Sequence, residues 1–242
     1  MKVCMAIAFV CFVIPSFSQK DTVALGKGFR ASAPLAYKSD YLQVWRMPDG
    51  TARMPLFASK SVELLTFNNT PTWALIQQYR KEKTVDRDTT YFDEKTLQPL
   101  AYRTNLPSEG YSENVSFTKD LITVQIQYKD SSKVISYPVS GGYIQATMMD
   151  YLISKLPLQK GYSTSFRSVN AGSHFDEMIT TITVTDKEDL VFSSSMSIPC
   201  WKVEVITGKS KSWQWYSVAE QSLMKLELGS KERALFVKSR IL

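Results

Sequence analysis

Short segments of alternating apolar and polar residues, separated by clusters of turn-forming residues, recur through most of this 242-residue chain. Leu121–Tyr128 is the clearest segment, because Ile122, Val124 and Ile126 alternate with polar residues. Period-two alternation places side chains on opposite faces of a β-strand. The short spacing between segments indicates hairpins, so the pattern predicts an antiparallel sheet or barrel of about ten or more strands.

One hairpin is especially well marked. Residues 84–92 are rich in β-branched and aromatic residues, which fit a pleated surface. Asp93 can open a turn by accepting backbone N–H bonds, and Pro99 suits the start of the returning strand. We expect Tyr91 and Tyr102 to form a cross-strand pair in this hairpin. Residues 186–189, with sequence Asp-Lys-Glu-Asp, are expected to form another turn farther along the chain.

The period changes after the Ser-Gly-Gly break at residues 140–142. Apolar residues then recur every fourth position up to Pro157, which predicts one helix at Tyr143–Lys155. This apolar stripe has two interpretations. Packing against the sheet is favoured, and the alternative is the wall of a lipid pocket, with Met148 and Leu152 as candidate ligand contacts.

The N-terminus has the features of a secretory signal peptide. A basic start at Lys2 precedes an apolar run from residue 3 to 14, and small residues follow at Ser16 and Ser18. The run is shorter than the roughly 20 residues that span a bilayer. We therefore expect a signal peptide at residues 1–18, a single β-rich domain at 19–242 and no membrane-spanning segment.

The rest of the composition indicates a bacterial periplasm or cell surface. Cys200 is the one cysteine outside the predicted signal peptide, so the mature chain has no internal disulfide framework. The formal net charge is +6, but lysines and arginines are interleaved with acidic residues. A nucleic-acid-binding protein needs a basic stripe on a recognisable module, so nucleic acid is not an expected partner.

The chain shows no catalytic, cofactor or metal motif. His174 is the sole histidine, and Asp176 two positions later supplies only one further ligand, whereas metal sites usually need three or four. Neither a Gly-x-Ser-x-Gly elbow nor a phosphate-binding glycine loop is present. Cys200 precedes Trp201 in a predicted strand, where a buried and inert thiol is expected.

Three tryptophans form the most suggestive group of side chains. Trp201, Trp213 and Trp215 belong to neighbouring predicted strands, and we expect them to face the same interior. Packing of the concave side of a curved sheet is the favoured role. The alternative is a cavity wall for an apolar ligand.

Five short motifs stand out together: the turn at Tyr91–Leu100, Leu156–Leu158 with Gly161, Cys200–Val205, Trp213–Tyr216 and Met224–Leu228. With these motifs the chain resembles the bacterial exported proteins grouped as domain of unknown function 3108. The resemblance implies a Gram-negative envelope location and a largely antiparallel, curved or partly open barrel. It also implies an outline similar to periplasmic lipoprotein carriers, whose half-barrel and helix enclose an acyl-chain cavity. It implies no established activity and no functional residues.

These observations lead to three functional hypotheses. The first is a non-enzymatic protein of the periplasm or outer membrane surface that binds a lipid or another apolar small molecule in the concave face of its sheet. The second is an interaction or scaffolding module, with a filled core, that binds another envelope protein. The third is a hydrolase centred on His174.

Overall fold

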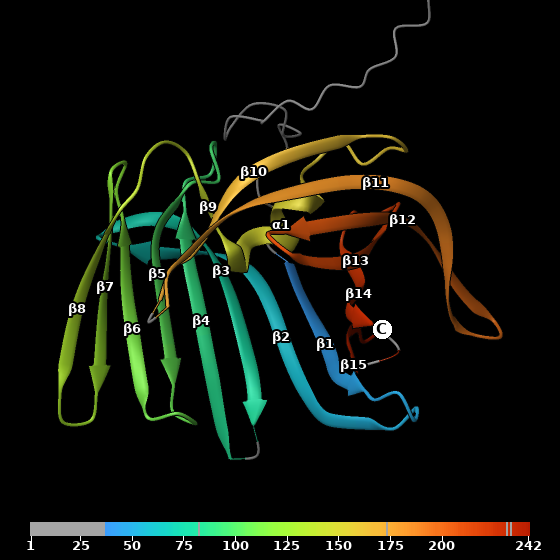
Figure 1. Ribbon diagram of the computed structural model, residues 1–242, viewed down its shortest axis with the longest axis horizontal. Coiled ribbons are helices and arrows are strands. Elements are labelled where there is room, and N and C mark those ends of the chain that lie inside the picture. The colour runs from blue at the N-terminus through green and yellow to red at the C-terminus, as the bar shows by residue number, and fades with distance from the viewer. Residues whose placement is uncertain (1–36, 82, 173, 231, 233) are drawn as a thin grey trace, which may run out of the picture.

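The computed structural model describes residues 37–242 apart from 82, 173, 231 and 233 (Figure 1). The predicted signal peptide at residues 1–18 lies outside this part of the chain. The described residues form fifteen strands, a 3-10 helix η1 (Ala146–Met148) and an α-helix α1 (Met149–Ser154). The strands are β1 (Tyr37–Arg46), β2 (Ala52–Phe67), β3 (Thr70–Lys81), β4 (Thr84–Phe92), β5 (Pro99–Leu106), β6 (Tyr111–Phe117), β7 (Leu121–Tyr128), β8 (Ser132–Pro138), β9 (Ile144–Gln145), β10 (Ser163–Asn170), β11 (Asp176–Ser193), β12 (Met196–Thr207), β13 (Ser210–Ser217), β14 (Leu223–Ser230) and β15 (Ala234–Arg240).

All fifteen strands belong to one sheet, in the order β8-β7-β6-β5-β4-β3-β2-β1-β15-β14-β13-β12-β11-β10-β9. Each strand pairs antiparallel with its neighbour, except that β9 and β10 are parallel. The first and last strands meet at the middle of the sheet, where Val44 lies opposite Val237. The sheet is therefore two meanders joined by the β1–β15 pair, which confirms the mainly β, antiparallel prediction.

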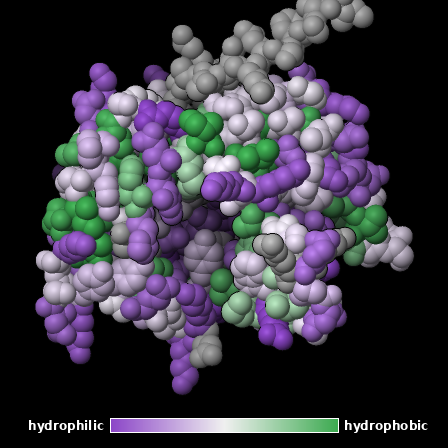
Figure 2. All heavy atoms as spheres, in the orientation of Figure 1, coloured by the Kyte–Doolittle hydropathy of each residue, from purple (hydrophilic) through white to green (hydrophobic). Residues whose placement is uncertain are grey.

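The sheet is not closed into a barrel, because its outer strands β8 and β9 follow each other in the chain but do not pair. The two meanders stand on either side of α1 (Figure 1). In the same orientation the surface is hollowed near its middle, and hydrophilic side chains surround the hollow (Figure 2).

The helix packs into the core between the two meanders. Leu152 and Ile153 contact a cluster that includes Phe166 and Val203 from the C-terminal meander. Met148 belongs to a cluster with Leu75, from the N-terminal meander. Burial of both sides of one short helix therefore attaches the two halves of the sheet to each other.

The opening between the two outer strands, β8 and β9, is covered partly by side chains. Val169 and Ala171, at the end of β10, are buried against Val115 and Val124 of the opposite meander. Tyr143 donates a hydrogen bond from its hydroxyl to the backbone oxygen of Thr118 at 2.8 Å. These contacts hold the two ends of the sheet against each other without strand pairing.

The single helix predicted at Tyr143–Lys155 was too long. Ile144 instead pairs with Ser168 in the parallel β9–β10 contact. The Gln145 side chain accepts from the Ala171 backbone N–H at 3.2 Å and donates to its carbonyl at 3.4 Å. These tertiary bonds override the local helical pattern, so an α-helix forms only at Met149–Ser154.

The well-marked hairpin is present, but its tyrosines do not pair. Asp93 accepts the backbone N–H of Thr96 at 2.8 Å, which confirms the predicted turn. Tyr91 lies opposite Ala101, and Tyr102 lies opposite the preceding residue on β4. Because directly opposite residues share a face and consecutive residues alternate, Tyr91 and Tyr102 project from opposite faces of the sheet.

The turn predicted at residues 186–189 is also wrong. Strand β11 continues through this region to Ser193, and Glu188 lies opposite Cys200. The register shifts between Val184 and Asp186, which is the mark of a β-bulge. The bulge accommodates the polar residues within a long strand, and the chain turns only after Ser193.

Gly229, near the end of β14, provides a test of the β14–β15 pairing. Gly229 has φ +103°, and a Cβ there would lie 2.4 Å from the backbone oxygen of Ala234. Gly50 has φ +81°, but a Cβ there would have no atom within 4 Å. We expect Gly50→Ala to cost about 1 kcal/mol from backbone strain alone. We expect Gly229→Ala to cost roughly 3 kcal/mol, because strain and a backbone clash add. Urea unfolding of both variants checks this, and equal losses would contradict it.

Candidate functional site

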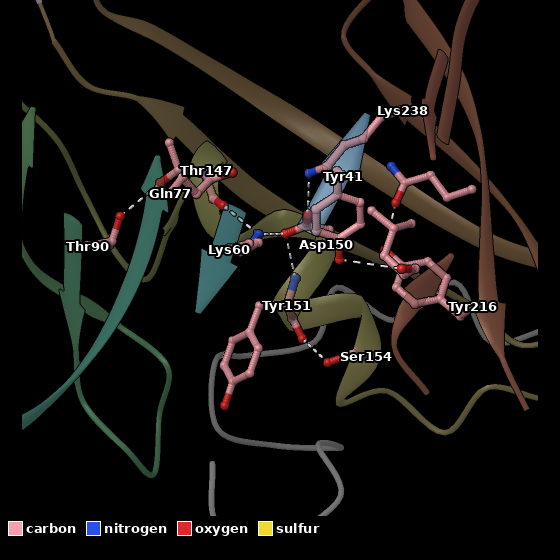
Figure 3. A network of polar contacts seen from close by, with 12 residues as sticks. Tyr41, Lys60, Gln77, Thr90, Thr147, Asp150, Tyr151, Ser154, Tyr216 and Lys238 are labelled. Carbon is pink, nitrogen blue, oxygen red and sulfur yellow. Dashed lines mark hydrogen bonds and ion pairs between the residues drawn. The ribbon is translucent and has the colours of Figure 1, made fainter. Parts of the chain in front are cut away.

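Three charged side chains meet in the interior where α1 contacts the sheet (Figure 3). Asp150 of α1 forms an ion pair with Lys60 of β2 and a second with Lys238 of β15, whose Nζ lies 3.4 Å from Asp150 Oδ2. The Lys60 side chain is only 2% exposed. We call Lys60, Asp150 and Lys238 the buried triad.

Strand alternation explains why the two lysines point inward. Lys60 lies between Ala58 and Val62, which are both buried, so it shares their inward face. Lys238 lies opposite Gln43 across the β1–β15 pair, and both side chains are buried. The lysines therefore occupy positions where this pattern usually places apolar residues.

Further hydrogen bonds connect the buried triad to η1 and β4. Lys60 Nζ also donates to the backbone oxygen of Thr147 at 3.5 Å. The hydroxyls of Thr147 and Thr90 lie 2.9 Å apart (Figure 3). Since β2, β4, β15 and both helical segments contribute, the position of α1 is defined by polar contacts as well as by apolar packing.

Burial and the neighbouring charges shift the pKa values of Lys60 and Asp150 in opposite directions. Burial lowers the pKa of Lys60 to about 8, although the Asp150 carboxylate opposes this change. Burial alone would raise the pKa of Asp150, but the attraction of Lys60 and Lys238 outweighs it and lowers that pKa to about 2. Asp150 is therefore ionised at neutral pH, and its carboxylate faces two ammonium groups.

A pocket of about 340 Å³ adjoins the buried triad, with Asp150 in its wall. Tyr41 donates from its hydroxyl to the Leu223 backbone oxygen at 3.4 Å, and Lys238 Nζ lies 4.4 Å from the centre of its ring. Tyr151 also lines the pocket, and its buried hydroxyl has no hydrogen-bond partner among the described residues. The full lining is Tyr37, Lys38, Ser39, Tyr41, Asp150, Tyr151, Ser154, Lys155, Glu220, Gln221, Ser222, Leu223 and Arg240.

The wall of this pocket, which we call the tyrosine pocket, combines aromatic rings with cations. The rings of Tyr37 and Tyr151 are stacked with their centres 6.2 Å apart. Lys155 Nζ lies 5.2 Å from the centre of the Tyr151 ring, within the range of a cation–π contact. Arg240 Nη1 donates to Glu220 at 2.6 Å. Such a wall can accept an apolar group against the rings and a polar group near the cations.

A second hollow, of about 460 Å³, lies across β1 to β4. Its wall includes Phe57, Val85 and Ile241, all of which are exposed apolar side chains. The tyrosine pocket is the better candidate site, because buried polar groups adjoin it.

The prediction that Trp201, Trp213 and Trp215 share one interior face is wrong. Trp213 lies opposite Glu204 and Trp215 opposite Lys202, so both project from the same face as these charged residues. Trp201 alternates to the other face and packs against the core cluster that includes Phe166 and Val203. Trp213 and Trp215 instead form a separate cluster with Cys200.

The other residues singled out in the sequence lie apart from the tyrosine pocket. Met148 and Leu152 are fully buried in two different core clusters. Neither of them, nor any of the three tryptophans, lines either pocket described above, and their role in ligand binding stays a prediction. Cys200 is a buried free thiol whose pKa burial raises to about 11, with a further contribution from neighbouring carboxylates. His174 is exposed.

Residues 37–242, with their four gaps, hold no group of three or more His, Cys, Asp or Glu side chains that could bind a metal ion.

Neither the buried triad nor the tyrosine pocket is among the features predicted from the sequence. A signal for Lys60 was present, because a lysine between Ala58 and Val62 interrupts an inward-facing series. The pairing of Lys60 with Asp150 had no local signal, since the two residues are 90 positions apart.

The buried triad predicts an unequal response to neutralising its members. Asp150→Asn leaves two buried ammonium groups without a carboxylate, so we expect a loss of about 3–5 kcal/mol in the free energy of unfolding. Lys60→Met removes one ammonium and leaves the Asp150–Lys238 pair, so its cost should be clearly smaller. Urea unfolding at pH 7 measures both, and adding Lys60→Met to Asp150→Asn should recover part of the loss. A larger cost for Lys60→Met than for Asp150→Asn would contradict this interpretation.

The buried triad also predicts an acid-dependent loss of stability. The Asp150 pKa is lowered from 3.8 to about 2 in the folded state. Its contribution is therefore fully present above about pH 4 and is lost as the pH falls toward 2, which corresponds to about 2 kcal/mol. We expect the difference in unfolding free energy between the wild type and Asp150→Asn to shrink over this range. A difference independent of pH between 5 and 2 would contradict the lowered pKa.

Comparison with known proteins identifies the family. Among the described residues, no helix is both long enough and apolar enough to cross a membrane. No curated protein matches the chain. The family described as "Protein of unknown function (DUF3108)" matches residues 43–236, which is well over half of the chain. This match includes thirteen of the fifteen strands, β2 to β14, in full and the whole of α1. The chain therefore belongs to the DUF3108 family.

Proposed function

We propose that this protein is a non-enzymatic binding protein of the bacterial envelope, and that it holds a lipid-like or other small apolar molecule in the tyrosine pocket. The observation that carries the proposal is a pocket of about 340 Å³ with three tyrosines in its wall, next to a helix that a buried ion network holds in place. Ligand pockets commonly have volumes of about 300–1,000 Å³ and largely apolar or aromatic walls.

The construction of the pocket supports binding rather than catalysis. Tyr37 and Tyr41 are positioned by β1, at the centre of the sheet, and Tyr151 by α1. Rigid placement of aromatic rings reduces the entropic cost of ordering a ligand. The described residues around the pocket do not include a histidine or cysteine that could act as a general base or nucleophile.

Export is part of the proposal. The basic start, apolar run and small residues at 1–18 support a cleaved signal peptide. Together with the membership of the DUF3108 family, this leads us to propose a location in the periplasm or on the outer membrane of a Gram-negative bacterium. A lipid or lipid fragment would be a readily available ligand there.

A second candidate function is an interaction module that binds another envelope protein. One observation favours it. The outer strand β8 has a partner on one side only within the described sheet, and its Val134 is 63% exposed. An unpaired strand edge with exposed apolar side chains is a template for pairing with another chain.

Ligand binding can be tested with a neutral amphiphile. We expect mature protein to bind dodecanol in isothermal titration calorimetry, and Tyr37→Ala to weaken binding about tenfold through loss of ring contact. Tyr128→Ala is the matched control, because Tyr128 is 42% exposed and lies outside both pockets. Native mass spectrometry of protein purified from its own envelope should also show a co-purifying small molecule. Absence of both signals, together with a cross-linked protein partner, would favour the interaction module instead.

A further inference from the structure

The surroundings of the tyrosine pocket carry more positive than negative charge. The pocket wall contains the cations Lys38, Lys155 and Arg240 and the carboxylates Asp150 and Glu220. The two remaining members of the buried triad add two ammonium groups that contact Asp150. These seven groups have a formal net charge of +3, so the pocket favours a negatively charged occupant.

Both carboxylates near the pocket are already engaged. Asp150 is contacted by both lysines of the buried triad, and Glu220 accepts a hydrogen bond from Arg240 at 2.6 Å. The buried triad itself contains two cations and one anion. An excess buried charge is costly unless a counter-charge approaches it, and an anion in the adjoining pocket would supply one.

Lys155 is a half-buried cation in the wall of the tyrosine pocket. It follows α1 directly, and its ammonium lies over the Tyr151 ring. Within the described part of the chain it makes no ion pair with a carboxylate. Partial burial lowers the pKa of Lys155. A half-buried ammonium without a carboxylate partner gains more from a bound anion than an exposed one does.

We propose that the ligand of the tyrosine pocket is an anionic amphiphile, whose carboxylate or phosphate oxygens contact Lys155 while its apolar chain packs against Tyr37 and Leu223. This inference rests on the proposed function and deepens it by naming the class of ligand. The shared chemistry is an oxyanion at the end of an alkyl chain. A free fatty acid and a phosphate-bearing lipid headgroup both provide it.

The experiment compares amphiphiles that differ only in the head group. Calorimetric titrations of the mature protein, below the critical micelle concentrations, use dodecanoate, dodecyl phosphate, dodecanol and dodecyltrimethylammonium. We expect at least one of the two anions to bind about tenfold or more tightly than dodecanol, since charge-assisted contacts are stronger than neutral ones. The cationic amphiphile should bind more weakly than dodecanol. The anion that binds better identifies the head group as carboxylate or phosphate.

Three variants test whether Lys155 produces the preference for an anionic head group. Lys155→Met retains the aliphatic stem and should clearly weaken the preference for the anion, while dodecanol affinity stays within about twofold of the wild type. Lys155→Arg keeps the charge and should retain the preference. Lys160→Met is the matched control, because Lys160 is 69% exposed, lies outside the tyrosine pocket and pairs with Asp186 at 3.2 Å. Thermal unfolding confirms that each variant is folded.

The outcomes separate this inference from the proposed function. Equal affinity for dodecanol and both anions would overturn the inference and leave ligand binding intact. A preference for the anion that is unchanged in Lys155→Met would also overturn it, because the charge would be recognised elsewhere. Failure of all four amphiphiles to bind would overturn the proposed function itself.

Discussion

The contact between Asp150 and two lysines determines how the parts of this molecule are arranged. Lys60 belongs to the N-terminal meander, Lys238 to the last strand, and Asp150 to the helix in the connection between the meanders. The sheet is open between β8 and β9, so strand pairing alone leaves the separation of its outer strands undetermined. The buried triad joins both halves to one helix, and the apolar clusters around Leu152 and Met148 complete that attachment.

Such a triad restricts the position of α1 more than it adds to the free energy of unfolding. Buried ion pairs often contribute little net stability, because removing charges from water is costly, and apolar residues of similar volume can replace them without loss. An apolar contact, however, would permit small displacements of α1 along the sheet. Two ammonium groups on one carboxylate permit far fewer arrangements. Since Tyr151 is the residue directly after Asp150, a defined position for Asp150 also defines the wall of the tyrosine pocket.

The strands could be predicted from the sequence because their signals are local. Period-two alternation and turn residues such as Asp93 act within a few positions, and they correctly indicated an antiparallel sheet. The errors arose where distant contacts outweigh local preference. Gln145 bonds to Ala171 and interrupts the predicted helix, and pairing with β12 extends β11 through residues that resemble a turn. The tryptophans were assigned to one face because alternation within a strand does not specify the register between strands.

The candidate site was harder to predict for the same reason. Tyr41 is 182 residues from Leu223, whose backbone oxygen it contacts, and no local pattern connects them. The sequence does contain two exceptions to the rule that inward-facing strand positions are apolar, because Lys60 and Lys238 occupy such positions. Local rules are most often broken at functional sites, where another requirement compensates for the cost. Two lysines on one carboxylate leave a positive charge in the interior, and a pocket beside that charge is the place where a negatively charged ligand would be stabilised most.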